Sequence, residues 1–343
     1  MSYQVTIQPS GHSFQVQPDE TVLVAALREG FGLAYGCRNG ACGSCKGKLL
    51  EGAIDYGKHS DTALSADEQA NGLALFCVAR PLGDIVIECR EVGAIKDQQI
   101  KILPCRVQTI DKPAPDVAVI SLKLPANERL QYLAGQYIEF LLKDGKRRSY
   151  SMANAPHDDA LLQIHVRHLA GGLFTDHVFE TMKARDILRF EGPHGTFFFR
   201  EDSEKPMVLL ASGTGFAPIK AIIEHTLYKG ITRPMTLYWG ARRPHDLYMD
   251  ELARHWAAEH AHFKYVPVVS DALPEDAWTG RGGFVHRAVM EDFSDLSGHQ
   301  VYACGAPVVI EAARRDFSAH CALPPEEFYA DSFTTEADLA KVK

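Results

Sequence analysis

The sequence lacks the features of a membrane, secreted or nucleic-acid-binding protein. No apolar run approaches the ~20 residues that span a bilayer. The start of the chain has neither the basic region nor the long apolar stretch of a signal peptide. A formal net charge of −8 at pH 7 argues against general nucleic-acid binding. We therefore expect a cytoplasmic protein with no membrane and no nucleic acid among its partners.

Low-complexity tracts and internal repeats are lacking too. The composition is that of an ordinary globular protein, with 46% hydrophobic and 23% charged residues. Single hydrophobic cores rarely grow beyond about 250–300 residues. A chain of 343 residues therefore predicts two or three domains.

Cysteine, by contrast, is well represented, with eight residues, and four of them share an informative spacing. Cys37, Cys42 and Cys45 read C-x4-C-x2-C, and Cys77 follows later. This is the spacing of a plant-type [2Fe–2S] cluster, in which two irons share four thiolates. Glycines inside the loop allow the backbone to curl and to direct its N–H groups at sulfur. A zinc site usually shows two C-x-x-C pairs, and a disulfide framework needs an oxidising compartment, so we favour the cluster.

Residues 1–95 predict a small α+β domain around this loop. Apolar alternation and helical spacing predict the strands Tyr3–Ile7, Ser13–Gln17, Gly47–Leu50 and Ile85–Glu88 and the helix Val22–Arg28. This arrangement resembles the β-grasp fold of ferredoxins. The following segment, Val92–Ile100, has little periodicity, and we predict a linker there.

Residues 100–203 predict a six-stranded antiparallel β-barrel. Short strands alternate with turn residues, as in small closed barrels. The predicted strands are Lys101–Ile110, Val117–Lys123, Gln136–Leu142, Ser149–Met152, Leu161–His168 and Ile187–Glu191.

From residue 204 to 335 strands and helices alternate, which predicts a doubly wound parallel α/β domain. The predicted strands are Met207–Ala211, Met235–Trp239, Phe263–Val269 and Gln300–Ala303, and the predicted helices are Ile219–Tyr228, Asp250–Glu259 and Val285–Phe293. A loop with glycines, Ser212–Pro218, joins the first strand to the first helix. Such a loop places a phosphate at the helix N-terminus.

The stretch Arg148-Ser149-Tyr150-Ser151 resembles the R-x-Y-S/T flavin signature of the ferredoxin–NADP reductase superfamily. In that signature an Arg pairs with pyrophosphate as a fork, a Tyr ring stacks on isoalloxazine, and a Ser hydroxyl reaches the reactive flavin edge. The resemblance implies that these four residues bind FAD, and that Tyr150 and Ser151 lie at the reacting centre.

Two later segments extend this resemblance. The first holds a second group of expected FAD-binding residues. Glycines in it precede a predicted helix, whose first N–H groups can bind a phosphate. The group comprises His165, Val166, Arg167, Gly171, Gly172, Leu173 and Thr175. The stretch Glu191–Phe197 resembles the G-P-x-G-x-F turn that closes the family's barrel. Within it we interpret His194 as a turn residue rather than a catalyst, because turns favour short polar side chains.

The α/β segment carries two more motifs of the same superfamily. Four residues match its pyridine-nucleotide loop, G-T-G-x-A-P: Gly213, Thr214, Gly215 and Pro218. Three match C-G-x-P, whose cysteine lies beside the reacting nicotinamide ring: Cys304, Gly305 and Pro307. The alternative for the cysteine is a small residue packed at the end of a buried strand. Its place at the strand's carboxyl end favours the site.

Over essentially the whole chain, the sequence resembles the reductase components of multicomponent oxygenases and reductases of the CDP-6-deoxy-Δ3,4-glucoseen reductase type. The resemblance implies a [2Fe–2S] domain at 1–95, an FAD domain at 100–203 and an NAD(P)H domain at 204–335. It also implies an aromatic residue over the flavin near the carboxyl terminus. Phe333 is the candidate, although ten residues follow it.

The implied activity is NAD(P)H-dependent electron transfer through FAD and the cluster to a separate acceptor protein, either an oxygenase component or an iron–sulfur dehydratase. Arg242 and Arg243, after the second α/β strand, favour NADPH. The nearest relatives mostly use NADH, so we expect NADH, with NADPH as the alternative, and we expect a monomer. A free-standing flavin reductase or diaphorase is a competing function. A non-catalytic redox sensor is another. The presence of all the residues expected for hydride transfer argues against it: Arg148, Tyr150, Ser151, Gly213, Gly215 and Cys304.

Overall fold

The computed structural model describes residues 2–96, 98–143, 145–335 and 342. The chain folds into two compact units. The first contains the chain up to Gln99, the short piece Gly195–Phe197 and the chain from Asp331 onward. The second contains Ile100–His194 and Phe198–Ala330.

The first unit contains a mixed five-stranded sheet in the order β2-β1-β7-β3-β5, in which β1 and β7 run parallel. This is the β-grasp arrangement predicted from the sequence. Its elements are β1 (Tyr3–Gln8), β2 (Ser13–Val16), α1 (Val22–Arg28), β3 (Lys46–Glu51), β4 (Ile54–Asp55), α2 (Ala66–Ala70), β5 (Leu73–Leu75), β6 (Arg80–Pro81), β7 (Ile85–Glu88) and a 3-10 turn at Gly93–Ile95. Val5 and Ile7, at alternating positions of β1, are fully buried, and so is Val22 of α1.

The predicted linker begins inside the core of this unit. Val92 and Ile95 are both buried, and the Val92 N–H donates to the Gly32 carbonyl at 2.6 Å. The boundary between the two compact units therefore follows this packed turn, between Gln99 and Ile100.

A second long-range contact within the first unit involves Thr196. Its Oγ1 accepts a hydrogen bond from the Tyr35 N–H at 2.8 Å and donates one to the Tyr35 carbonyl at 2.9 Å. Tyr35 stands two residues before Cys37. The contact therefore fixes the backbone that leads into the cysteine loop.

The second unit begins with a six-stranded antiparallel sheet in the order β11-β10-β13-β8-β9-β12. Its elements are β8 (Lys101–Ala114), β9 (Val117–Lys123), β10 (Tyr137–Leu141), β11 (Arg147–Ser151), β12 (Leu162–Arg167), α3 (Leu173–Asp176), a π-helical turn at His177–Thr181 and β13 (Ile187–His194). A bridge between Met152 and Ile164 brings the two outer strands together, so the sheet curls back on itself around a core that includes Phe140 and Phe190.

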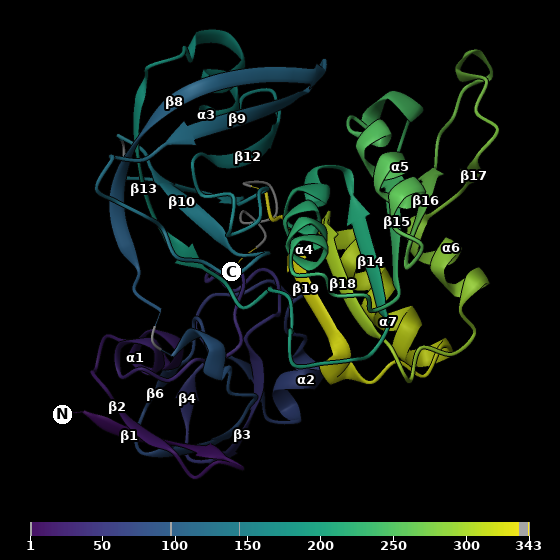
Figure 1. Cartoon of the computed structure of the whole chain (residues 1–343). Coiled ribbons are helices and arrows are strands. Elements are labelled where there is room, and N and C mark those ends of the chain that lie inside the picture. The colour runs from purple at the N-terminus through teal and green to yellow at the C-terminus, as the bar shows by residue number, and fades with distance from the viewer. Residues whose placement is uncertain (1, 97, 144, 336–341, 343) are drawn as a thin grey trace. The chain divides into compact units, whose positions relative to one another are not determined.

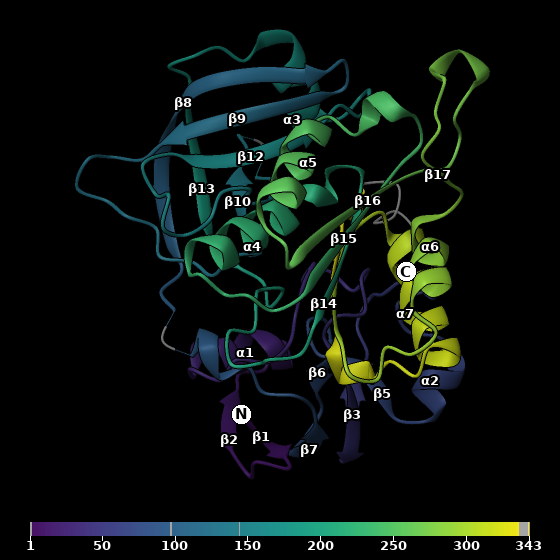
Figure 2. The same ribbon diagram turned by 45° about the vertical axis from the view of Figure 1, so that its right-hand side comes forward.

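The rest of the second unit is a six-stranded sheet in the order β17-β16-β15-β14-β18-β19, with helices on both faces. Its strands are β14 (Met207–Ser212), β15 (Met235–Ala241), β16 (Phe263–Val269), β17 (Arg281–Gly282), β18 (Gln300–Gly305) and β19 (Phe328–Ser332). Its helices are α4 (Phe216–Tyr228), α5 (Asp250–Glu259), α6 (Val285–Asp292) and α7 (Pro307–His320), with 3-10 turns at Gly213–Gly215, Pro244–Asp246, Pro274–Asp276 and Pro325–Glu327. Helices α4 and α5 cover one face and α6 and α7 the other (Figures 1 and 2), as right-handed crossovers require.

Two features of this sheet differ from the prediction. Helix α4 begins at Phe216, three residues before the predicted start. Pro218 is tolerated there because the N–H groups of the first helical turn have no partner inside the helix. Helix α7, which starts with Pro307, and strands β17 and β19 were not predicted.

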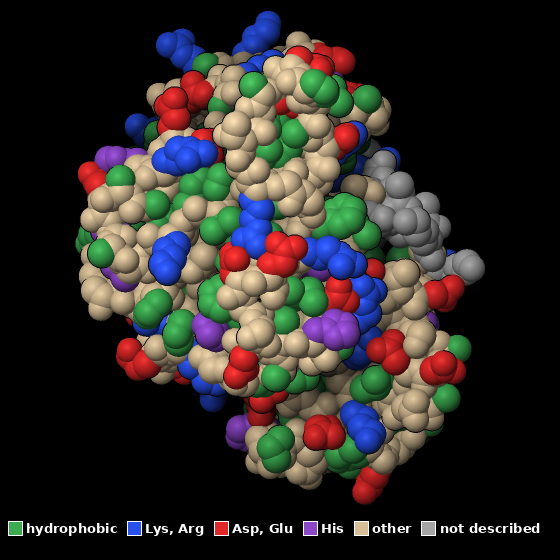
Figure 3. All heavy atoms as spheres, turned by 90° about the vertical axis from the view of Figure 1, so that its right-hand side faces the viewer, with side chains coloured by type: hydrophobic (Ala, Val, Ile, Leu, Met, Phe, Trp, Pro, Cys, Tyr) green, Lys and Arg blue, Asp and Glu red, His purple; other side chains and the backbone are tan. Residues whose placement is uncertain are grey.

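The described residues include no helix that is both long and apolar enough to cross a membrane. On the face drawn in Figure 3, basic side chains lie among acidic ones.

Candidate functional site

The four predicted cluster ligands come together in the first unit. Cys45 and Cys77 are buried, and Cys37 and Cys42 are half-buried. The Cys37 N–H donates to Cys42 Sγ at 3.4 Å. A hydrogen bond between the Cys37 and Cys42 side chains lowers the pKa of Cys42 and raises the pKa of Cys37. A hydrogen bond between the Cys45 and Cys77 side chains raises the pKa of Cys45. Two thiol pairs thus face one another, as a four-thiolate centre needs.

The glycines of this loop are required by geometry. Gly40 has φ +77°, and a Cβ there would lie 2.6 Å from the Lys58 carbonyl oxygen. A Cβ at Gly36 would lie 3.3 Å from Cys42 Sγ. The backbone therefore curls closely around the sulfurs and points an N–H group at one of them, which fits a [2Fe–2S] cluster.

The flavin signature lies on β11, an outer strand of the barrel sheet. Tyr150 packs against Phe174, with ring centroids 5.1 Å apart, and burial raises its pKa above the ordinary range. Arg148 shares its face of the strand because side chains alternate. The two serines of the signature, Ser149 and Ser151, lie on the other face of the strand. Ser149 Oγ donates to Glu139 Oε1 at 3.3 Å, and Ser151 is buried.

The glycine turn after β12 differs from the expected phosphate-binding helix. Helix α3 has only four residues. The Gly171 N–H donates to Asp176 Oδ2 at 3.0 Å and the Gly172 N–H to the Leu169 carbonyl at 2.8 Å. Thr175 Oγ1 also donates to the Leu169 carbonyl, at 2.8 Å. The two glycine N–H groups are thus bonded within the turn, and Leu173 is half-exposed beside them.

The glycine loop Ser212–Pro218, called the coenzyme loop below, packs directly on the C-G-x-P segment, Cys304–Pro307. A Cβ at Gly215 would lie 2.1 Å from the Cys304 carbonyl oxygen, and a Cβ at Gly305 would lie 2.5 Å from the Ser212 carbonyl oxygen. Cys304 is fully buried at the end of β18 and pairs in register with Ala211 of β14. The two glycines therefore keep side chains out of the crevice at the carboxyl ends of the central strands, where nucleotides bind in doubly wound sheets.

Arg167, at the end of β12, faces this crevice. Its guanidinium lies 3.6 Å from the place that a Cβ of Gly213 would take. Its Nε and Nη2 are buried and, among the described residues, have no hydrogen-bond partner, although Asp116 lies 3.4 Å from Nε. Asp246 Oδ1 also lies 4.0 Å from Nη2. Two buried guanidinium nitrogens without a hydrogen bond are costly. They fit a site for a phosphate of FAD or of the nicotinamide coenzyme.

Other predicted residues have different surroundings. Val166 is fully buried in the barrel core, so its side chain does not line an open site. His194 ends β13 and is fully buried, with Nε2 3.2 Å from Glu191 Oε1. It therefore belongs to a strand rather than to the turn that was predicted. Thr214 and Phe333 are half-buried, Phe333 just after β19 in the first unit.

The arginines after β15 differ in their partners. Arg243 forms a fork with the two Asp276 oxygens at 2.7 and 2.8 Å, and this contact lowers the pKa of Asp276 to about 2. Arg242 is 80% exposed, with Asp271 at 3.8 Å. The Asp271 N–H donates to the Arg242 carbonyl at 2.9 Å, which holds the Asp271 carboxylate close to the end of β15.

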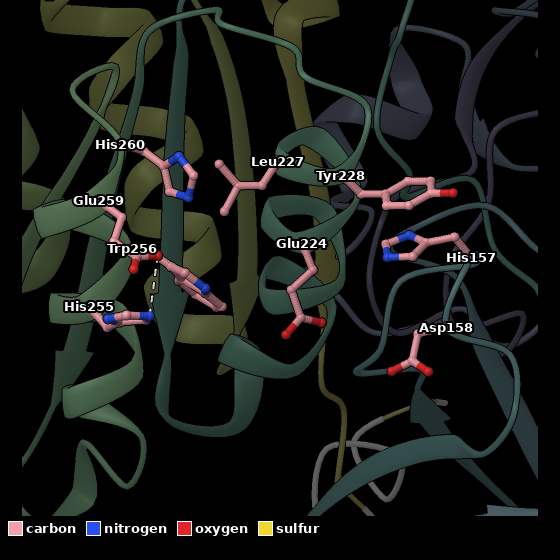
Figure 4. A pocket seen from close by; sticks show the side chains of 9 residues that line it. All are labelled: His157, Asp158, Glu224, Leu227, Tyr228, His255, Trp256, Glu259 and His260. Carbon is pink, nitrogen blue, oxygen red and sulfur yellow. Dashed lines mark ion pairs between the residues drawn. The ribbon is translucent and has the colours of Figure 1, made fainter.

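A separate cavity of about 610 Å³ lies at the carboxyl-terminal ends of α4 and α5 (Figure 4). Glu224 lines it between Trp256 and the stacked rings of His157 and Tyr228. Burial raises the pKa of Glu224. The coenzyme loop meets α4 at its other end, and a helix of 13 residues is about 20 Å long. This cavity is therefore not the coenzyme site.

Two residues at the crevice were missed from the sequence, Trp239 and Tyr248. The Trp239 indole N–H donates to the Gly213 carbonyl at 3.0 Å, and Tyr248 Oη lies 2.8 Å from Nδ1 of His165. Neither residue belongs to a motif that was matched. The only signal was the position of Trp239 at the end of a central strand.

A cysteine loop suited to an iron–sulfur cluster, a flavin-type barrel and a nucleotide-type α/β sheet define the class of electron-transferring oxidoreductases. Family models agree with each segment. A 2Fe-2S iron-sulfur cluster binding domain matches residues 5–82, an oxidoreductase FAD-binding domain residues 104–199, and an oxidoreductase NAD-binding domain residues 209–315.

Known proteins with similar sequences span the whole chain. The CDP-6-deoxy-L-threo-D-glycero-4-hexulose-3-dehydrase reductase of Yersinia pseudotuberculosis is 42% identical over 97% of this chain and 99% of its own. The reductase component 2 of terephthalate 1,2-dioxygenase from Comamonas sp is 35% identical over 98% of both chains. The crystal structure of the Amycolatopsis cytochrome P450 reductase GcoB matches with a TM-score of 0.77 and 34% identity, over 97% of this chain and 99% of that one. The chain belongs to this family of NAD(P)H-dependent iron–sulfur flavoprotein reductases.

Proposed function

We propose that this protein takes a hydride from NADH onto FAD and delivers electrons one at a time, through a cluster held by Cys37, Cys42, Cys45 and Cys77, to a separate acceptor protein. When bound, FAD accepts the hydride and returns two electrons singly with loss of one proton, which is chemistry that belongs to the cofactor. The observation that carries the proposal is the pairing of four thiols from two segments around a tightly curled loop.

Replacement of Cys77 by Ser tests the ligand assignment. We expect the purified variant to lose the electron paramagnetic resonance signal of the reduced cluster while it keeps FAD, because Arg148, Tyr150 and Ser151 lie in the other unit. Cys89→Ser is the matched control, since Cys89 lies in the same unit but is absent from the thiol group. A normal cluster signal in Cys77→Ser would refute the assignment.

For the flavin and coenzyme sites, we propose roles that follow the geometry. Arg148, Tyr150 and Ser151 bind FAD along β11. The crevice formed by Gly213–Gly215 and Cys304 takes the nicotinamide coenzyme, and Arg167 pairs with a phosphate there. The coenzyme roles are supported by the glycine packing at the crevice and by the buried Arg167 nitrogens. The FAD roles on β11 are supported by the match to the R-x-Y-S/T signature.

The coenzyme that we propose is NADH. Arg243 already forms an ion pair with Asp276, so it is not free to pair with the 2′-phosphate of NADPH. The Asp271 carboxylate near the end of β15 suits a ribose hydroxyl and repels a phosphate. A comparison of kcat/KM for the two coenzymes tests this choice, and equal values would contradict it.

The acceptor that we propose is an iron–sulfur dehydratase acting on a deoxysugar nucleotide. The support is the 42% identity to a reductase whose name specifies a CDP-6-deoxy-hexulose dehydrase. An oxygenase component is the second candidate, since two oxygenase reductases are similar at 35% and 34% identity. Reconstitution with each kind of partner, scored by product formed per NADH consumed, decides between them.

We also propose that the protein acts in the cytoplasm as a monomer. None of the eight cysteines forms a disulfide, which suits a reducing compartment. Size-exclusion chromatography with light scattering tests the oligomeric state.

A further inference from the structure

Three buried aromatic side chains lie behind the coenzyme loop. Trp239 and Phe216 stack face to face, with centroids 3.9 Å apart and planes 9° apart. Tyr248 meets the Trp239 ring edge-on at 5.2 Å. The Trp239 indole N–H also donates to the carbonyl of Gly213, the loop residue with φ +55°. The aromatic group therefore supports the loop that is proposed to carry the coenzyme.

A chain of hydrogen bonds connects this group to the barrel. Tyr248 Oη lies 2.8 Å from His165 Nδ1, and His165 Nε2 lies 3.4 Å from Gln163 Oε1. Gln163 and His165 belong to β12. The amide oxygen of Gln163 only accepts, so Nε2 carries the imidazole proton and Nδ1 accepts from the Tyr248 hydroxyl.

Both members of the central bond are neutral. Burial lowers the pKa of His165 to about 3 and raises the pKa of Tyr248 above its ordinary range. The pair therefore keeps its protonation state between pH 6 and 9, since even pH 6 lies about three units above the pKa of His165. Its contribution is geometric, because it holds Tyr248, in the turn just before α5, at a fixed place on strand β12 of the barrel.

We infer that Tyr248 is a positioning residue for hydride transfer, whose bond to His165 sets the separation between the coenzyme loop and the flavin strand. Arg167 on the same strand β12 faces Gly213, so two residues of β12 contact this assembly. Hydride transfer is sensitive to such a separation, since reacting atoms must approach to about 3–3.5 Å. The inference rests on the proposed FAD and coenzyme sites.

Tyr248→Phe in the full-length holoprotein tests the inference, because it removes one hydroxyl and keeps the ring. We expect FAD and iron content to stay normal and the NADH dissociation constant to change less than twofold. The anaerobic rate constant of flavin reduction in stopped flow should fall roughly three- to tenfold, as expected for one net hydrogen bond. The long-wavelength absorbance of the stacked nicotinamide–flavin complex should weaken in parallel. The loss should be the same at every pH from 6 to 9.

Tyr238→Phe is the matched control. It also removes a tyrosine hydroxyl from the α/β segment, one on β15 that donates to Asp292 Oδ2 at 2.6 Å, and it should leave the rate unchanged. In a double-mutant cycle, Tyr248→Phe should have little further effect in a His165→Ala background.

Four outcomes would overturn the inference: an unchanged rate in Tyr248→Phe, an equal loss in Tyr238→Phe, a loss that appears only at one end of the pH range, or a loss of bound FAD. The first makes Tyr248 a packing residue, the second reports general destabilisation, the third a proton relay and the fourth a structural role. Failure of the wild-type protein to reduce its flavin with NADH would instead refute the proposed function.

Discussion

At the scale of single residues, the crevice depends on a glycine. A Cβ at Gly215 would meet the Cys304 carbonyl at 2.1 Å, and backbone on both sides leaves no flexible side chain to move. We expect Gly215→Ala to cost about 1–3 kcal/mol of stability through overpacking and to raise KM for NADH at least tenfold. FAD content should stay near normal, because the flavin strand is β11.

Steady-state kinetics and thermal unfolding measure these two effects. Gly298→Ala is the control, since Gly298 has open space around the place of a Cβ. An unchanged KM in Gly215→Ala would show that the coenzyme does not use this crevice.

His165 makes stability depend on pH. Its folded pKa is lowered to about 3 by burial, whereas an unfolded histidine titrates near about 6.5. Between these values the unfolded state binds more protons, so stability falls as pH falls below about 6.5, by up to about 1.4 kcal/mol per pH unit. We expect His165→Gln to lose less stability than the wild type between pH 6.5 and 5.

Urea unfolding followed by tryptophan fluorescence at each pH provides the measurement. His320→Gln, at an exposed position on α7, should follow the wild type. Parallel pH profiles for the wild type and His165→Gln would mean that His165 is not buried and neutral.

At the scale of elements, the outer face of β10, β11 and β13 holds a charged group that no motif predicted. Arg147 Nη1 lies 3.2 Å from Glu139 Oε2 and 2.9 Å from Glu191 Oε1, and His194 joins Glu191 from the end of β13. The group links three adjacent strands beside the flavin signature. The only sign of this group in the sequence is Glu139, which interrupts the apolar run of β10.

Arg147→Ala removes a cation from two largely buried carboxylates, Glu139 and Glu191. We expect this to cost about 1–3 kcal/mol of folding stability and to lower the melting temperature by several degrees. Arg189→Ala, at an exposed position on β13, is the comparison and should change little. Differential scanning calorimetry measures both. Equal melting temperatures would mean that solvent compensates the carboxylates.

Helix α7 has the sequence pattern of an amphipathic helix. Ile310, Ala313 and Phe317 are buried at helical spacing, and Pro307 occupies the first turn where proline is favoured. The signal was therefore present, and the helix was predictable. The contact between His165 and Tyr248 is different, because 83 residues separate the pair and no local periodicity reports such a contact. Strands, the order of the domains and the cysteine loop follow from local pattern, whereas contacts across the crevice follow only from the tertiary fold.

At the scale of the whole molecule, the question is whether the flavin and coenzyme segments fold without the ferredoxin segment. The barrel core uses residues between Leu103 and Phe190, and the α/β core between Val208 and Phe328. Both cores therefore lie within residues 100–343. Separation does remove the partner of Thr196, whose hydroxyl bonds Tyr35, so some stability is lost.

We expect a fragment of residues 100–343 to fold, bind FAD and oxidise NADH with ferricyanide, which accepts electrons directly from flavin. It should not reduce cytochrome c or the acceptor protein, because the single-electron outlet has been removed. A fragment of residues 1–95 should bind a cluster and show no NADH oxidation. Mixing the two should restore transfer only weakly, since the covalent connection supplies an effective concentration up to about the millimolar range. A 100–343 fragment that cannot bind FAD would mean that contacts such as that of Thr196 with Tyr35 are needed for the barrel to form.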